Sequence, residues 1–422
     1  MSTQVNHGST PSEALASANK GDGWRGGVRH YGPSVLAAAV VFAAYFYLRP
    51  PTSVGGHHEY RTWSYAHLAY SDIAALYASH SLANHAFPYV HTAIEYPVLT
   101  GIYMWTAAWF GGFQGYFLAS AVGIAICAAL TAAMLRSMTP RAAWLFAGSP
   151  ILFVYSLLNW DLLAIALMVG GIYYFRKGAY LTSGILFSLG TSAKLFPVIA
   201  LIFFALELYK DRHDPASQRA VKRLLLGALG AGVLVNLPFV LLNFRGWFYF
   251  FDFNYARSGG GGLLGRIPFL NRLPVSELDL VEAVVLVSAL VWLGRKQWRG
   301  LSAEEAAAGA MAVFMLLNKT YSPQYVLWIS TLVLIAGWPY WIFAVLSVMG
   351  ISDYGSAFVT MHLEQSDSPQ LGWYVHEVGP KFLDVRLSAI ACALVPLFSR
   401  SKAARVQESP SRCLPQPDVR PK

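Results

Sequence analysis

Apolar runs of about 15 to 20 residues, separated by short polar segments, recur along the chain between residues 33 and 398. Runs of this length are typical of helices that cross a bilayer. We therefore predict an all-α fold, a polytopic transmembrane helical bundle of about 12 spans. The expected spans are residues 33–48, 116–135, 142–157, 160–175, 179–193, 196–209, 223–243, 278–294, 304–317, 324–337, 338–350 and 381–398.

Polar sequence flanks this predicted membrane domain (residues 33–398) on both sides. Residues 1–32 are polar and rich in Gly and Ser, so we expect a disordered cytoplasmic N-terminal segment there. The first apolar run lacks a small-residue cleavage site and is expected to be retained as a span. Residues 399–422 are expected to form a disordered, basic cytoplasmic tail.

Composition excludes an ordinary soluble globular protein. The chain has 422 residues, of which 55% are hydrophobic and only 13% charged, and its mean hydropathy is +0.44. Three cysteines, Cys127, Cys392 and Cys413, lie far apart. Neither a disulfide framework nor a thiolate metal site is therefore expected.

The expected orientation depends on how residues 98–110 are interpreted. If this run crosses the membrane, every later loop changes side. If it lies along the outer surface or dips into it, most of the 31 Lys and Arg residues fall inside, which the positive-inside rule favours. We therefore expect both termini to be cytoplasmic. The net charge of +9 then sets orientation and attracts anionic lipid, and no nucleic-acid partner is expected.

Three segments on the predicted outer side are long: residues 49–115, 244–277 and 351–380. In the first, the apolar positions of residues 71–83 favour an amphipathic helix on the membrane surface. In the second, Ser258 precedes four glycines, which indicates a hinge for a gating loop. This face also gathers acidic and aromatic side chains, a composition suited to a polyhydroxylated ligand.

Asp72 is the leading candidate for chemistry. It follows Tyr70 and Ser71 in the first outer segment, where packing gives little reason for an acidic residue. One interpretation is structural, because Ser71 and Asp72 both suit the N-terminal end of a helix. The other is a general base within hydrogen-bond reach of a hydroxyl nucleophile.

Several other outer residues offer hydrogen-bonding or stacking groups for a sugar or an acceptor. For Glu95 the alternative is a helix that begins at Pro97 with an acidic lead-in. For Asp161 it is a helix cap, while Trp160 offers a stacking surface for a sugar. The candidates for sugar or acceptor binding are Glu95, Tyr96, Trp160, Asp161, Tyr321 and Gln324.

Four outer cations are candidates for binding a phosphate anion. Lys194 and Lys319 lie at expected span boundaries on the outer side, where positive charge is disfavoured. For Lys194 the alternative is a lysine that extends to the interface. Arg257 and Arg266 flank the glycine run, and they either complete the anion site or are solvated.

No cofactor and no metal are expected, although the sequence leaves a divalent metal open. His57, His58, Glu59 and His67 match the spacing of no standard metal site. A transporter or flippase for lipid-linked sugars is the main alternative from another class, since outward cations and a glycine hinge occur there too. A transporter should carry polar residues at the midplane of several spans, whereas here polarity gathers at one surface. An accessory subunit with a decayed site is a third alternative.

In chain order these motifs resemble the polyprenyl-phosphate-sugar-dependent membrane glycosyltransferases of the C-type superfamily, in particular family 87, which includes mannosyltransferases. The resemblance covers residues 33 to about 400. The motifs that carry it are Tyr70-Ser71-Asp72, Pro88-Tyr89, Glu95-Tyr96-Pro97, Asn159-Trp160-Asp161, Ala193-Lys194-Leu195-Phe196-Pro197 and Lys319-Thr320-Tyr321-Ser322-Pro323-Gln324-Tyr325.

The resemblance implies a C-type architecture whose first outer loop carries amphipathic surface helices and a catalytic aspartate, matching Asp72. It implies a polyprenyl-phosphate sugar donor whose phosphate is held by basic residues, matching Lys194 together with Lys319 and Arg257. It further implies transfer of a hexosyl group, mannose in preference, to a glycolipid or polysaccharide acceptor of the cell envelope. The expected location is the plasma membrane, with the site on its outer face and residues 98–110 as a surface or re-entrant helix.

The residues themselves are consistent with this chemistry. A glycosidase needs two carboxylates because an alkoxide leaves poorly, whereas a phosphate leaves as a stable anion and needs charge neutralisation more than a proton. One base, Asp72, and cations such as Lys194 and Lys319 suffice for inverting transfer.

Overall fold

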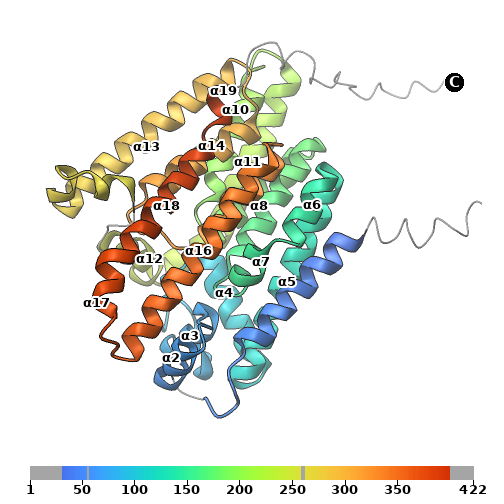
Figure 1. Ribbon diagram of the computed structural model, residues 1–422. Coiled ribbons are helices and arrows are strands. Elements are labelled where there is room, and N and C mark those ends of the chain that lie inside the picture. Colours follow the sequence, from blue (N-terminus) through green and yellow to red (C-terminus); the bar gives the residue numbers. More distant parts are fainter. Residues whose placement is uncertain (1–30, 55–56, 258–261, 400–422) are drawn as a thin grey trace, which may run out of the picture.

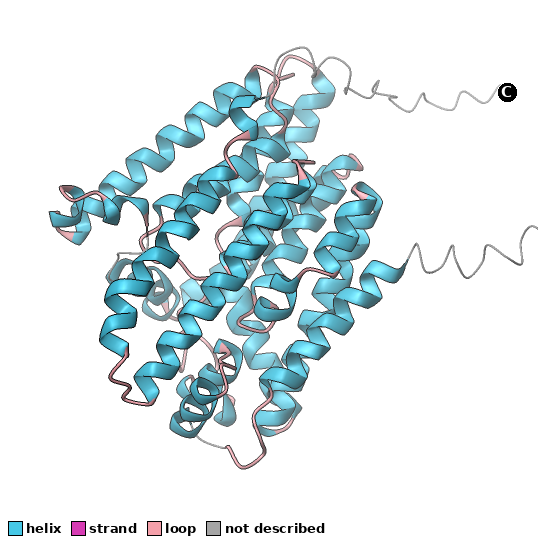
Figure 2. Ribbon diagram, in the orientation of Figure 1, coloured by secondary structure: helices cyan, strands magenta, loops and turns pink. Residues whose placement is uncertain are grey.

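The computed structural model describes residues 31–54, 57–257 and 262–399. In these ranges the regular structure is helical and no strand occurs (Figure 2), which confirms the predicted all-α fold. The expected disordered ends (residues 1–32 and 399–422) lie outside the described residues, except that Tyr31 and Gly32 already belong to the first helix and Ser399 to the last. Of the glycine run, only Gly262 is described.

The helices, in chain order, are α1 (Tyr31–Leu48), α2 (His57–Ala66), α3 (Asp72–Ser79), η1 (Leu82–Asn84), α4 (Val98–Ala107), η2 (Ala108–Phe110), α5 (Gly112–Met138), α6 (Pro140–Ala147), α7 (Pro150–Tyr155), α8 (Asp161–Arg176), α9 (Tyr180–Ala193), α10 (Pro197–Tyr209), α11 (Pro215–Leu242), α12 (Phe244–Ala256), η3 (Leu263–Arg266), η4 (Leu270–Arg272), α13 (Val275–Trp298), α14 (Ala303–Leu317), α15 (Tyr325–Ile335), α16 (Tyr340–Gln365), α17 (Leu371–Trp373), the π-helix η5 (Tyr374–Val378), α18 (Gly379–Cys392) and α19 (Pro396–Ser399).

The long helices run side by side as one bundle (Figure 1). The helices α2, α3 and α17 lie at one end of this bundle, and α10 and α19 reach the other end (Figure 1). Among the described residues, α1, α5, α11 and α16 are each long and apolar enough to cross a membrane unaided. Of the other predicted spans, α13 has 24 residues but is mostly exposed. Helices such as α8, α14 and α15 are shorter and largely buried.

Two predicted elements in the first half of the bundle differ in detail. The expected span 142–157 is broken into α6 and α7, because Ser149 and Pro150 begin a new helix and the Ser149 hydroxyl accepts the Ile151 N–H at 3.3 Å. The run 98–110 forms α4, whose ten residues extend only about 15 Å, half of a hydrocarbon core. Val98 and Met104 are buried, so α4 packs within the bundle.

The predicted amphipathic helix at residues 71–83 is shorter and less exposed than expected. It forms α3 and ends at Ser79. Ile73, Ala74 and Ala75 are buried, so α3 is part of the core rather than a helix that only rests on its surface.

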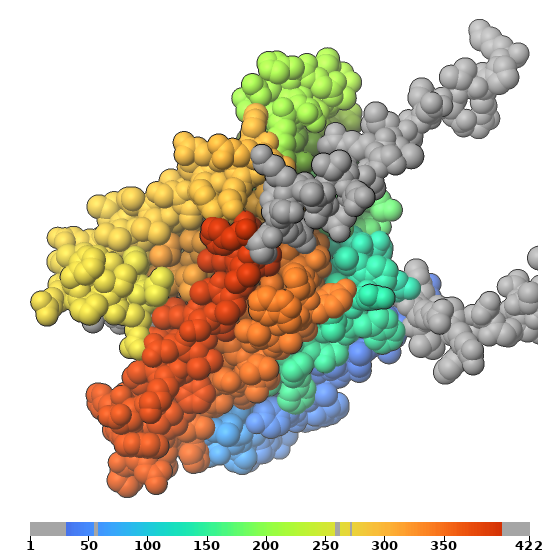
Figure 3. Space-filling view, turned by 45° about the horizontal axis from the view of Figure 1, so that its top comes forward, coloured from blue at the N-terminus to red at the C-terminus, as the bar shows by residue number. Residues whose placement is uncertain are grey.

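In the last part of the bundle one helix is longer than expected, and it carries one member of a buried charge pair. The helix α16 continues past residue 350 to Gln365, where a loop was predicted. Asp353 on α16 is 2% exposed and accepts the Arg386 Nε–H of α18 at 3.0 and 2.9 Å. The pair joins two helices that lie side by side, next to α13 on the face shown in Figure 3.

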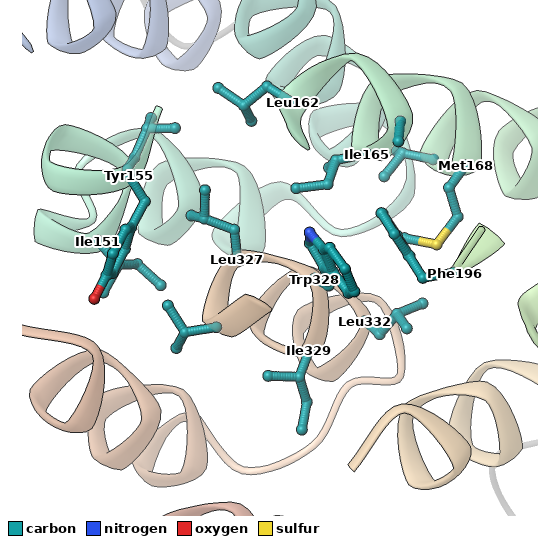
Figure 4. Packing of buried hydrophobic residues seen from close by; sticks show 14 of the residues in the cluster. Ile151, Tyr155, Leu162, Ile165, Met168, Phe196, Leu327, Trp328, Ile329 and Leu332 are labelled. Carbon is teal, nitrogen blue, oxygen red and sulfur yellow. The ribbon is translucent and has the colours of Figure 1, made fainter. Parts of the chain in front are cut away.

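An aromatic stack fixes α15 against the middle of the bundle. The rings of Phe196 and Trp328 lie parallel with centroids 4.1 Å apart, among Ile165, Met168 and Leu332 (Figure 4). Offset aromatic stacking adds about 0.5–1.5 kcal/mol to the area that such rings bury. Because Phe196 follows Lys194 closely and Trp328 follows Gln324, the stack holds two of the predicted site segments together.

Candidate active site

A cavity of about 490 Å³ opens between residues 70–96, α12, α13 and the segment before α15. Its wall contains residues that the sequence singled out, from Asp72 to Gln324 in the chain. The predicted residues that line it are Asp72, Glu95, Tyr96, Lys194, Arg257, Lys319 and Gln324.

The start of α3 is anchored to the α7–α8 connection. The Asp72 N–H donates to the Leu158 carbonyl at 2.7 Å, and the Ser71 hydroxyl donates to the Leu157 carbonyl at 2.5 Å. Ser71 therefore precedes α3 without capping it through its side chain. The hydroxyl of Tyr60 completes the anchor by accepting the Ser71 N–H at 2.9 Å. These bonds leave the carboxylate of Asp72 facing the cavity.

Two tyrosines and a lysine surround the Asp72 carboxylate. The Tyr96 hydroxyl donates to Oδ2 at 3.2 Å. Burial raises the pKa of Asp72 above its usual range, while the hydrogen bond from Tyr70, the positive charge of Lys194 and the hydrogen bond from Tyr96 act in the opposite direction. Asp72 is thus a carboxylate with increased proton affinity that still has hydrogen-bond donors to stabilise its charged form.

Lys194 is held by a second carboxylate. Its Nζ lies 3.0 Å from Oδ1 of Asp161 and 4.7 Å from the centroid of the Tyr96 ring. Asp161 is completely buried, and its backbone N–H donates to the Asn159 side-chain oxygen at 3.0 Å. Lys194 ends α9 in extended backbone, so its side chain turns from the helix end toward this carboxylate.

The other predicted cations differ in their partners. Lys319 lies 2.8 Å from Oδ2 of Asp279 and donates to the Tyr255 carbonyl at 3.1 Å. Arg257, exposed at the end of α12, makes no ion pair with any residue in the described ranges. Arg266 pairs with Asp384 at 2.5 Å and does not line the cavity.

Three predicted sugar or acceptor residues lie behind the cavity wall. Trp160 is completely buried and packs edge-on against Tyr96, with ring centroids 5.3 Å apart. The Arg386 guanidinium lies over the Tyr321 ring, with its central carbon 4.1 Å from the ring centroid. Asp161 faces Lys194. The stacking surface that we expected from Trp160 is unavailable to a ligand in this structure, because the indole has no exposed face.

Part of the wall was not predicted from the sequence. The helix α12 contributes Phe250, Phe253 and Asn254, and α13 contributes Glu282. A signal existed for α13, because Asp279 and Glu282 are acidic residues inside an apolar run, three positions apart and therefore on one face of the helix. The aromatic content of α12 pointed only to a membrane interface.

One histidine contacts a residue of the cavity wall. The Nε2 of His80, which follows α3, lies 2.8 Å from Oε2 of Glu95. In the described part of the chain, no group of three or more His, Cys, Asp or Glu side chains is arranged to hold a metal ion.

The model of glycosyltransferase family 87 matches residues 94–323, more than half of the chain. This chain belongs to glycosyltransferase family 87. The family membership confirms the predicted resemblance, and with the apolar helices it makes the chain a membrane glycosyltransferase. Membership of an enzyme family argues against the transporter alternative. The match contains Glu95, Lys194 and Lys319 and begins after Asp72. No curated protein matches the chain.

The Lys194–Asp161 pair gives a prediction for stability. Lys194→Met leaves the buried carboxylate of Asp161 without its cation, and we expect a loss of about 3–5 kcal/mol in the free energy of unfolding. The double substitution Lys194→Met with Asp161→Asn removes both charges and should recover much of that loss. Denaturant unfolding in mixed micelles measures both, with exposed Lys177→Met as the matched control. Strictly additive effects of the two single substitutions would show that the pair is not coupled.

Proposed function

We propose that this glycosyltransferase moves a hexosyl group, mannose in preference, from a polyprenyl-phosphate sugar to a hydroxyl of a cell-envelope glycolipid or polysaccharide, with inversion at the anomeric carbon. One observation carries the proposal: the carboxylate of Asp72 and the cations Lys194, Arg257 and Lys319 line a single cavity. A base and an anion site in one cavity are the two elements that transfer from a phosphate leaving group requires.

In the proposed reaction Asp72 accepts the proton of the acceptor hydroxyl. The hydroxyl oxygen forms a bond to the anomeric carbon, on the face opposite the phosphate. The bond between that carbon and the phosphate oxygen breaks, and its electron pair leaves with the polyprenyl phosphate. Charge is conserved, because the proton rests on Asp72 and the negative charge passes to the phosphate. Tyr96 holds the Asp72 carboxylate in position through its hydrogen bond at 3.2 Å.

The charges of the cavity support a phosphodiester as the donor group. Lys194 and Lys319 are each paired with a carboxylate, Asp161 and Asp279. Arg257 makes no ion pair among the described residues, so its guanidinium N–H donors remain for a ligand. A phosphodiester carries one negative charge, which one guanidinium balances with two parallel hydrogen bonds. Glu95 and Gln324, on the remaining wall, offer acceptor and donor groups for sugar hydroxyls.

A lipid-linked donor also accounts for the membrane setting of the site. The donor stays in the bilayer, so the cavity must open near the membrane surface. Asp72, at the start of α3, belongs to the cavity wall, and α3 lies at one end of the bundle (Figure 1). We assign this end to the outer face of the plasma membrane, with both chain ends cytoplasmic, on the distribution of Lys and Arg.

The assignment of Asp72 as the base predicts that Asp72→Asn abolishes transfer, because the amide cannot accept the proton. We expect a loss of about 10²–10⁴-fold in kcat with unchanged insertion and thermal stability. The measurement incubates purified protein with a panel of radiolabelled polyprenyl-phosphate sugars and envelope lipids, and it also identifies the sugar. Asp252→Asn, on the exposed part of α12, is the matched control. Undiminished transfer by Asp72→Asn would show that Asp72 is not the base.

The hydrogen bond from Tyr96 predicts a shift in the pH profile. Tyr96→Phe removes a donor that lowers the pKa of Asp72, so that pKa rises further. Since only the deprotonated carboxylate accepts a proton, activity is lost on the acid side, and we expect the acid limb of the kcat/KM profile to move to higher pH. Tyr103→Phe, whose hydroxyl donates to the distant Ser120 carbonyl, should leave the limb in place. If the acid limb stays at the same pH in Tyr96→Phe, the hydrogen bond from Tyr96 does not lower the pKa of Asp72.

The lack of an ion pair at Arg257 predicts a donor-specific defect. Arg257→Gln should raise the KM for the polyprenyl-phosphate sugar about tenfold or more, as expected for the loss of a charge-assisted hydrogen bond, while the KM for the acceptor changes little. Initial rates at varied donor and acceptor concentrations separate the two. Arg266→Gln, which breaks only the pair with Asp384 outside the cavity, is the control. A defect confined to the acceptor would place Arg257 at the other substrate.

A further inference from the structure

One turn of α16, from Gly350 to Tyr354, is held firmly in the bundle. The helix α16 runs beside α18 on one side and α7 on the other (Figure 1). An added Cβ at Gly350 would lie only 2.9 Å from the Ile151 side chain of α7 and 3.0 Å from the Val326 side chain of α15. The Tyr155 hydroxyl of α7 donates to the Gly350 carbonyl at 2.6 Å. This turn of α16 is therefore a fixed reference point for what its other residues contact.

The same turn carries Asp353, which holds the Arg386 guanidinium of α18. Both carboxylate oxygens of Asp353 accept the Arg386 Nε–H, and the Asp353 side chain is only 1% exposed. Replacing a buried ion pair with apolar side chains often costs no stability, so stability alone gives little reason for this pair. Its effect on its surroundings is specific, because it fixes the guanidinium over the ring of Tyr321, 4.1 Å from the ring centroid.

Tyr321 belongs to residues 318–324, which connect α14 to α15 and form part of the active-site wall. Over these described residues the backbone has no regular helix. The Thr320 N–H donates to the Asn318 side chain at 3.0 Å, and such local contacts shape the segment. Tyr321 turns away from the cavity and attaches the segment to α18. Its neighbours line the cavity: Lys319, Thr320, Ser322 and Gln324.

The adjacent residue of α16, Tyr354, contacts the segment that leads to Asp72. Its hydroxyl donates to the Leu68 carbonyl at 2.8 Å. Leu68 has a left-handed φ of 55°, which is costly for a residue other than glycine and persists only where contacts hold it. Since Asp353 and Tyr354 are consecutive, one turn of α16 is linked to the segment of the proposed base and, through Arg386, to residues 318–324.

We propose that Asp353 and Arg386 are positioning residues of this transferase. Asp353 holds the Arg386 guanidinium over the Tyr321 ring, and this stack keeps residues 318–324 in the conformation that presents Lys319 and Gln324 to the cavity. The pair itself lies behind the cavity wall. The inference rests on the proposed function for the role of Lys319 at the donor phosphate.

Two substitutions weaken the stack without leaving Asp353 unpaired. Arg386→Lys keeps a positive charge beside Asp353 but loses the planar group that stacks on an aromatic face. Tyr321→Leu removes the ring and leaves the ion pair intact. If both act on one contact, the double variant should lose little more than either single variant.

The matched control is Arg176→Lys. The Arg176 guanidinium pairs with Glu304 at 2.9 Å, at the opposite end of α14 from residues 318–324. The same change is therefore made in a second ion pair between helices, one that does not contact the active-site wall.

The first measurement is hydrogen–deuterium exchange of the purified protein in micelles, without substrate. For Arg386→Lys and Tyr321→Leu we expect faster exchange in peptides that contain residues 318–324, unchanged exchange in the other helices and nearly unchanged Tm. The second measurement is initial rates with polyprenyl-phosphate mannose and an envelope lipid extract as acceptor. Here we expect kcat/KM for the donor to fall about tenfold, while the KM for the acceptor changes little. Arg176→Lys should show neither effect.

Unchanged exchange in residues 318–324 would overturn the proposal, and so would strictly additive losses in the double variant. Faster exchange throughout the bundle, with activity falling in step with Tm, would show that the pair only stabilises the helices. Faster local exchange with unchanged donor kinetics would also reject a positioning role. If the variants show local exchange but the unchanged protein transfers no sugar from this donor, the attachment of residues 318–324 is supported and the proposed donor is wrong. Failure of the inference and failure of the proposed function are thus distinguishable.

Discussion

The site depends on the contact between the start of α3 and the α7–α8 connection. The Asp72 N–H and the Ser71 hydroxyl donate to two consecutive carbonyls, of Leu158 and Leu157. A buried backbone N–H requires a partner, and here that requirement joins segments more than eighty residues apart. The same connection continues into Asp161, the partner of Lys194. One short stretch of backbone therefore sets the positions of both the proposed base and the proposed phosphate site.

This arrangement couples the charges of Asp72 and Lys194 electrostatically. The Lys194 ammonium lies between the Asp161 carboxylate and the face of the Tyr96 ring, and its charge lowers the pKa of Asp72 against the effect of burial. In the proposed reaction, negative charge develops on the leaving phosphate, and the same ammonium stabilises it. The stabilisation that it gives to ionised Asp72 then decreases, so the pKa of Asp72 rises as the proton arrives. Base and leaving-group site thus assist each other through one cation.

Hydropathy predicted the bundle and the positions of most of its helices, because apolar run length depends directly on bilayer thickness. Asp72 and Lys194 were indicated by the family resemblance and by their charge at positions where packing or the positive-inside rule disfavours it. Run length says nothing about the direction in which a side chain points, so the burial of Trp160 was not predictable. The pairing of Asp161 with Lys194 and of Asp353 with Arg386 also depends on helix packing. The break before Pro150, in contrast, had a visible signal in the Ser-Pro sequence.

The helix α12 shows how a polar cavity can lie beside lipid. Phe244, Phe248 and Tyr255 form an exposed stripe at helical spacing, while Phe253 and Asn254, on another face, line the cavity. Aromatic side chains suit a membrane interface because they combine apolar area with a polar edge. A helix apolar toward lipid and mixed toward the cavity separates the two without closing the route between them. A substrate that is itself apolar at one end and anionic at the other requires such a boundary.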